Sequence, residues 1–174
     1  MKTLFALVAF TMLIPDPLRP DDGQAWGLEV EGYKLAIHTD KAAFNCGEPI
    51  KLGITLRNSS QEHGWVRFSG MPEIDYPATV LLPADWLPFR QQAPLTEEGL
   101  RRTNTRNRYV SNHGGPFYAG AERVAELDLN TLYDMRRSGE YDVTVSTKVR
   151  NRSGNGSSPI VSNNLKLTVG ACKQ

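Results

Sequence analysis

Residues 50–57 read Ile-Lys-Leu-Gly-Ile-Thr-Leu-Arg. Apolar residues stand at every second position, namely Ile50, Leu52, Ile54 and Leu56, and the residues between them are polar or small. Because the side chains of a strand point alternately to its two faces, this period of two predicts a strand with one buried face. Strands of this kind are typical of antiparallel sheets that cover a core on one side.

The same alternation recurs along the chain, in residues 125–130 and 141–149. Between Leu28 and Ile37 the phase changes at Gly32, which predicts a bulge or a strand that changes sheets there. The expected set is completed by strands at 65–68, 78–82 and 160–169 and by turns at 47–49, 58–60 and 151–158. About seven short strands in about 150 residues, without a long helix, predict an all-β, antiparallel two-sheet β-sandwich.

The N-terminus has the pattern of an export signal. Met1-Lys2 is followed by the uncharged run from Thr3 to Ile14, which is too short to span a bilayer as a helix. Gly23-Gln24-Ala25 then places small residues at the −3 and −1 positions of a cleavage before Trp26. We expect residues 1–25 to be a removed signal peptide and residues 26–174 to form one secreted or periplasmic domain. The alternative is that the apolar run is a buried N-terminal strand or helix.

The chain has two cysteines, Cys46 and Cys172. In an exported protein an even number of cysteines favours a disulfide over a metal site or a reactive thiol. If successive strands alternate in direction, the strand after Cys46 begins at the end of the sandwich where the last strand, before Cys172, finishes. The two thiols can then meet, so the sequence predicts a disulfide between them.

Residues 132–143 read Leu-Tyr-Asp-Met-Arg-Arg-Ser-Gly-Glu-Tyr-Asp-Val. They resemble the corner between strands E and F of immunoglobulin-like domains, where a tyrosine early in strand F bonds back to the backbone. With residues 47–58 and 162–169, this segment resembles stand-alone immunoglobulin-like modules of exported bacterial proteins. It is also similar to the bacterial proteinase-inhibitor type of this sandwich and to modules that accompany secreted metallopeptidases. Val143 stands where an antibody domain has its second core cysteine, and the resemblance transfers no functional residue.

Charge and motif spacing argue against several classes of function. The 20 Lys and Arg against 19 Asp and Glu give a net charge of +1, which does not favour nucleic acid or an anionic membrane as partner. The histidines His38, His63 and His113 are far apart and match no metal-binding spacing. Residues 113–115, His-Gly-Gly, lack an accompanying G-x-S-x-G nucleophile motif, so we interpret them as a flexible turn. We therefore expect no catalytic residue, no metal and no cofactor.

The segment from Pro83 to Gly120 is a long insertion between the middle strands, and long loops in compact domains are often functional. Within it, Glu97 and Glu98 are expected in the first turn of a short helix capped by Thr96. Arginines and aromatic residues gather in the segment, a combination that favours contacts with proteins, carbohydrates or anions. The candidate contact residues are Trp86, Phe89, Arg90, Arg101, Arg102, Arg106, Arg108 and Tyr109. The alternative is that Trp86, Phe89 and Leu100 form a small core beneath the loop.

The sequence as a whole predicts a binding protein. We expect an exported, non-enzymatic module that binds a protein or polysaccharide at the cell envelope or outside the cell through residues 84–120. It should bind no nucleic acid and should not span the membrane once the signal is removed. One alternative is a secreted proteinase inhibitor, which the resemblance suggests and which needs a rigid exposed loop. Another is a hydrolase, which needs a pocket lined by converging histidines and carboxylates.

Overall fold

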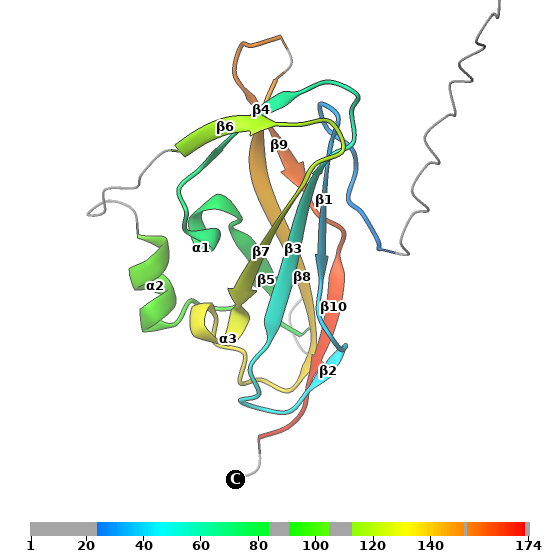
Figure 1. The fold of residues 1–174 in the computed structure, drawn as a ribbon. Coiled ribbons are helices and arrows are strands. Elements are labelled where there is room, and N and C mark those ends of the chain that lie inside the picture. The colour runs from blue at the N-terminus through cyan, green and yellow to red at the C-terminus, as the bar shows by residue number, and fades with distance from the viewer. Residues whose placement is uncertain (1–23, 84–90, 105–112, 152, 173–174) are drawn as a thin grey trace, which may run out of the picture.

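The structure is a computed structural model that describes residues 24–83, 91–104, 113–151 and 153–172, and strands dominate it (Figure 1). The strands are β1 (Tyr33–His38), β2 (Ala43–Phe44), β3 (Lys51–Asn58), β4 (Gly64–Phe68), β5 (Ala78–Leu81), β6 (His113–Phe117), β7 (Glu122–Asp128), β8 (Gly139–Arg150), β9 (Ser157–Val161) and β10 (Leu165–Val169). The helices are α1 (Pro72–Asp75), α2 (Glu97–Thr103) and α3 (Leu129–Leu132). None of the helices in the described ranges is long and apolar enough to cross a membrane.

Two larger sheets and one two-stranded ribbon contain these strands. One sheet has the order β1-β3-β7 and the other has the order β2-β10-β8-β5, while β9 pairs with the last part of β8. The ribbon consists of β4 and β6. All neighbours are antiparallel except β2, which runs parallel to β10. The predicted all-β chain with antiparallel sheets is therefore confirmed.

One apolar core joins the two larger sheets. Ile50, Leu52, Ile54 and Leu56 are at most 1% exposed, as their alternation predicts, and they belong to the same buried cluster as alternate residues of β8. Each such side chain stabilises the folded state by about 1.5–3 kcal/mol relative to an exposed one. Figure 1 shows β3 and β7 lying across β8 and β5, so that the inner faces of the sheets enclose this core.

The chain reverses direction at Glu31 and Gly32. Both residues have a positive φ, of 54° and 75°, and Val30 and Tyr33 exchange two backbone hydrogen bonds of 2.9 Å across them. Two consecutive left-handed residues form the tight turn that suits an antiparallel connection, and glycine adopts this geometry without a steric penalty. The change of phase at Gly32 thus marks a tight turn instead of a bulge, and the strand expected before it is reduced to a bridge at Val30.

The strands β3 and β7 leave their sheet together and continue as the β4–β6 ribbon. Asn58 holds this corner, because its backbone pairs with residues 120–121 at 2.9 and 3.0 Å. Its side-chain amide donates to the carbonyls of Glu62, Phe117 and Tyr118 at 2.8, 2.9 and 3.2 Å. The corner carries the ribbon across one end of the two sheets, where β4 comes close to β8 (Figure 1).

The predicted disulfide is present between Cys46 and Cys172, whose Cα atoms are 4.9 Å apart. The parallel pairing of β2 with β10 explains the approach of the two cysteines. It sets Phe44 beside Val169, and Gly170 donates a backbone hydrogen bond of 2.8 Å to the carbonyl of Phe44. The bond therefore fastens the first part of the chain to its last strand.

The described parts of the insertion form a helix and a strand. In α2 the Thr96 side chain accepts a hydrogen bond of 2.9 Å from the Gly99 N–H, so the predicted helix cap is confirmed. The interpretation of residues 113–115 as a flexible turn is wrong, because they belong to β6 and pair with β4. Gly114 also lies against the Trp65 indole, since a Cβ at this position would come within 2.6 Å of Trp65 Nε1.

Candidate binding groove

The contact surface predicted in the insertion lies only partly within the described residues. Arg101 and Arg102 lie on α2, where their Nε atoms donate to the Glu98 carboxylate at 2.6 and 2.7 Å. The hydrogen bonds from Arg101 and Arg102 lower the pKa of Glu98 to about 2. Leu100 is 57% exposed, so it contributes nothing to the small core considered as the alternative. The other predicted contact residues, Trp86, Phe89, Arg90, Arg106, Arg108 and Tyr109, lie outside the described residues.

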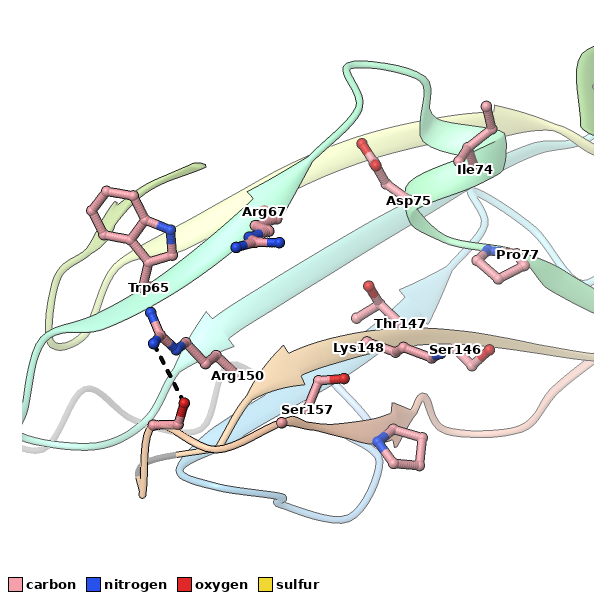
Figure 2. A pocket seen from close by; sticks show the side chains of 13 residues that line it. Trp65, Arg67, Ile74, Asp75, Pro77, Ser146, Thr147, Lys148, Arg150 and Ser157 are labelled. Carbon is pink, nitrogen blue, oxygen red and sulfur yellow. Dashed lines mark hydrogen bonds between the residues drawn. The ribbon is translucent and has the colours of Figure 1, made fainter. Parts of the chain in front are cut away.

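A groove of about 650 Å³ opens between β4 and the β8–β9 hairpin, and α1 and the residues after it close one end (Figure 2). Figure 2 shows Arg67 and Asp75 on one side of the groove and the side chains of β8 on the other. The lining residues are Trp65, Arg67, Ile74, Asp75, Pro77, Ser146, Thr147, Lys148, Arg150, Gly154, Gly156, Ser157 and Pro159.

The alternation of the two strands turns the polar side chains of the groove outward. In β4, Val66 is 5% exposed and packs in the core, so Trp65 and Arg67 on either side of it point to the surface. In β8, Val149 is fully buried, and its neighbours Lys148 and Arg150 are exposed. Trp65 keeps 43% of its surface accessible at one end of the groove.

The groove has a positive charge. Among the described lining residues, Arg67, Lys148 and Arg150 contribute three positive charges and Asp75 one negative charge, which leaves a net charge of +2. Among the described residues, none forms an ion pair with these three cations. Arg150 donates one bond, of 3.4 Å, to the carbonyl of Gly154. A groove lined by charges of one sign concentrates ligands of the opposite sign.

Pro77 determines where one edge of β8 becomes open. The register sets Ala78 opposite Val145, so Pro77 stands opposite Ser146. The carbonyl of Pro77 accepts a hydrogen bond of 3.1 Å from the Ser146 N–H. Proline has no N–H to donate in return, and the pairing between β5 and β8 ends there. From this point β8 is paired with β9 on one side, and its other edge borders the groove.

The groove has few groups for acid–base chemistry. Among the residues that the structure describes, Asp75 is the only carboxylate that lines the groove, and no histidine lines it. The Asp75 carboxylate accepts a hydrogen bond of 2.6 Å from the Ser69 N–H. Hydrolysis by general acid–base catalysis commonly uses two such groups on either side of the substrate. Across the described ranges, no three His, Cys, Asp or Glu side chains are grouped to hold a metal. The three cations that line the groove can attract an anion by charge and donate hydrogen bonds to it.

The sequence did not identify these groove residues as candidates. It predicted strands at 65–68 and 141–149, and Lys148 stands on the polar phase of the second strand. The signal that could have drawn attention to them is a tryptophan on the outward phase of a strand, two residues from an arginine. The approach of β4 to the end of β8 depends on the corner at Asn58, which links residues distant in the sequence.

No family model and no curated protein matches the sequence. Among solved structures, the chain is similar to the C-terminal domain of wzt, with 13% identity and a TM-score of 0.46 over 89% of this chain and 81% of that one. It is similar to a β-glucosidase from Listeria innocua in complex with isofagomine, with 14% identity and a TM-score of 0.41 over 80% of this chain and 16% of that one. It is also similar to a β-glucosidase from Erythrobacter marinus, with 10% identity and a TM-score of 0.40 over 79% of this chain and 15% of that one. The chain spans less than a fifth of these glucosidases, and similarities this distant assign it no function.

Proposed function

We propose that this chain is an exported, non-enzymatic immunoglobulin-like module that binds an anionic segment of a partner in the groove between β4 and β8. The observation that carries the proposal is the group of three cations, Arg67, Lys148 and Arg150, that have no ion-pair partner among the described residues. Like charges in one groove repel each other, and a bound anion removes this repulsion. The exposed ring of Trp65 at the end of the groove adds an apolar contact of the kind that anchors many interfaces.

The immunoglobulin-like part of the proposal is supported by the start of β8. The Tyr141 hydroxyl donates a hydrogen bond of 2.7 Å to the carbonyl of Arg137, four residues upstream. Tyr141 lies two residues before Val143, the position that corresponds to the second core cysteine of antibody domains. A tyrosine at this place, bonded back to the corner, is a hallmark of the sandwich. Sheets in the orders β1-β3-β7 and β2-β10-β8-β5 that share one core agree with this architecture.

The proposed location outside the cytoplasm rests on the N-terminal pattern and on the disulfide. Disulfides persist in oxidising compartments such as the periplasm and the extracellular space. The bond between Cys46 and Cys172 is compatible with those compartments. There the partner would be a protein or a polysaccharide, as the composition of the insertion leads us to expect.

A binding experiment with defined anionic probes tests the proposal. The full chain is expressed with its N-terminal segment so that it can be exported, and the purified protein is immobilised. It is exposed to a glutamate-rich peptide, to polygalacturonate and to uncharged counterparts, at about 50 mM and about 500 mM salt. We expect at least one anionic probe to bind, more weakly at high salt. The triple substitution Arg67→Ala, Lys148→Ala and Arg150→Ala should weaken binding about tenfold or more.

The matched control is Arg137→Ala, which removes an exposed cation just before the opposite end of β8. It should leave the affinity within about twofold. Thermal melting of all variants verifies that they fold. If no anionic probe binds, or if a folded triple variant binds as well as the unchanged protein, the groove is not the binding site.

A further inference from the structure

The open edge of β8 presents backbone hydrogen-bonding groups to the groove. Successive residues of an antiparallel strand turn their N–H and C=O groups alternately to its two sides. Val145 bonds toward the β9 side, since its N–H donates to Ser162 Oγ at 3.0 Å and its carbonyl accepts from the Ser162 N–H at 2.9 Å. Ser146 bonds to the opposite side, to Pro77. Lys148 and Arg150 have the same parity as Ser146, so their backbone groups point toward the groove.

No strand covers this edge among the described residues. The pairing of β5 with β8 ends at Ala78 and Val145. Pro77, which comes directly before Ala78 in the chain, has no N–H for the Ser146 carbonyl. The strand β4 approaches β8 from the groove side, but its pairing partner is β6. The Ser146 carbonyl, both backbone groups of Lys148 and the Arg150 N–H therefore form a short row without a paired strand. Such an unpaired edge is a template for another strand.

We propose that an extended, acidic peptide segment of a partner protein adds to β8 as a further strand along residues 146–150. This inference rests on the proposed function and names the ligand of the same groove. In strand addition, main-chain hydrogen bonds supply affinity and alternate side chains supply specificity. The row beyond Pro77 offers two carbonyls and two N–H groups for such pairing.

The side chains around the edge determine which peptide fits. Lys148 and Arg150 lie two residues apart on the outward face of β8, and Arg67 lies across the groove on β4. A strand between them would place every second side chain on that outward face. Acidic residues at this spacing would face the three cations, and opposite charges on neighbouring strands attract. The residues between them would point inward beside the half-buried Thr147, which favours small or apolar side chains. The expected ligand therefore alternates acidic and small apolar residues.

Two alternatives to strand addition are protection of the edge against aggregation and binding of an anionic polysaccharide, and each gives a different result in a peptide-binding experiment. Charged residues on an edge can simply prevent aggregation, in which case no peptide adds to it. An anionic polysaccharide would satisfy the cations but has no regular row of N–H and C=O groups to pair with β8. Dependence on the peptide backbone therefore separates strand addition from both alternatives.

The test uses a synthetic peptide of alternating glutamate and valine residues and two sets of N-methylated versions. One set is methylated on the even-numbered residues and the other on the odd-numbered residues, so each removes the N–H groups from one edge of the peptide strand. We expect the unmodified peptide to bind, one set to bind about tenfold or more weakly, and the other to bind within about twofold. Hydrogen exchange of the Lys148 amide should slow when the peptide is bound.

Charge reversal provides an independent measurement. The double substitution Lys148→Glu and Arg150→Glu should weaken peptide binding about tenfold or more, and Arg137→Glu should not. Equal binding by both methylated sets, or an unchanged exchange rate at Lys148, would overturn strand addition while leaving anion binding in the groove intact. Binding of polygalacturonate alone would also overturn it and would identify a polysaccharide ligand. If neither the peptide nor polygalacturonate binds, the proposed function fails together with this inference.

Discussion

Asn58 controls the position of β4 and therefore the shape of the groove, so its substitution tests both stability and binding. The residue is 1% exposed. Its Nδ2 donates to three carbonyls, those of Glu62, Phe117 and Tyr118, and its Oδ1 accepts from the N–H and the hydroxyl of Ser60 at 3.1 and 2.7 Å. The substitution Asn58→Ala removes all of these bonds at the corner between β3 and β4.

The expected loss of stability follows from these contacts. Nδ2 has two hydrogens, so two of the three carbonyls share one of them. A typical hydrogen bond contributes about 1 kcal/mol net, and a buried group left without a partner costs about 1–3 kcal/mol. The bonds to Glu62 and Ser60 are only partly buried, so water can replace them, and the bond to Phe117 is buried. We therefore expect Asn58→Ala to lower the free energy of unfolding by about 3 kcal/mol.

The substitution Asn58→Asp keeps the shape of the side chain and removes both donors. The introduced carboxyl would be buried and would face three carbonyl oxygens, which raises its pKa above the usual value of about 3.9. A raised pKa in the folded state means that stability is higher at low pH and is lost as the pH rises through that pKa. At neutral pH this variant should be less stable than Asn58→Ala, and the difference should shrink in acid.

Urea unfolding, followed by tryptophan fluorescence and circular dichroism, measures these changes. The exposed Asn155, substituted by alanine, is the matched control and should change stability by less than about 0.5 kcal/mol. A loss below about 1 kcal/mol for Asn58→Ala would refute the assignment of Asn58 as the residue that holds the corner. A variant Asn58→Asp that is as stable at neutral pH as in acid would refute the argument from the facing carbonyls.

Three further predictions concern the disulfide, α2 and the start of β8. Replacing Cys46 and Cys172 by serine should cost up to about 4–5 kcal/mol, because the bond closes a long loop, and mass analysis after alkylation without reductant should find no free thiol. The pKa of Glu98 is lowered to about 2, so the stability that its ion pairs contribute is fully present above pH about 4.3 and is lost as the pH falls through about 2. A carboxyl titration by NMR with a midpoint near 4.3 would contradict those ion pairs. Tyr141→Phe should lower stability by about 1 kcal/mol, and an unchanged urea midpoint would show that this hydroxyl contributes nothing.

Features that depend on local chemistry could be predicted from the sequence. The alternation in residues 50–57 identified a half-buried strand, because burial on one face imposes a period of two whatever the strand pairs with. Thr96 was identified as a helix cap from its position before two glutamates, since the cap is made within one turn. The disulfide required only the approximate direction of the strands that carry Cys46 and Cys172.

Features that depend on pairing between distant segments could not be predicted in the same way. A change of hydrophobic phase at Gly32 is compatible with a bulge or with a tight turn, and only the bonds between Val30 and Tyr33 distinguish them. Residues 113–117 contain glycines and a proline and show no alternation, so nothing local predicts a strand. They form β6 because the corner at Asn58 brings β4 alongside them.

The location of the groove follows from the register of one strand pair. Ala78 and Val80 are buried opposite Val145 and Val143, and a slip of one residue would turn the apolar face of β5 away from the core. Burial therefore fixes the register, and the register sets Pro77 opposite Ser146. The backbone groups of Ser146 point away from β9, toward Pro77. Because Pro77 has no N–H to donate to the Ser146 carbonyl, the pairing between β5 and β8 stops there and this edge of β8 is open. Pro77 is visible in the sequence directly before the predicted strand 78–82, but it marks the open edge of β8 only because of the residue it faces.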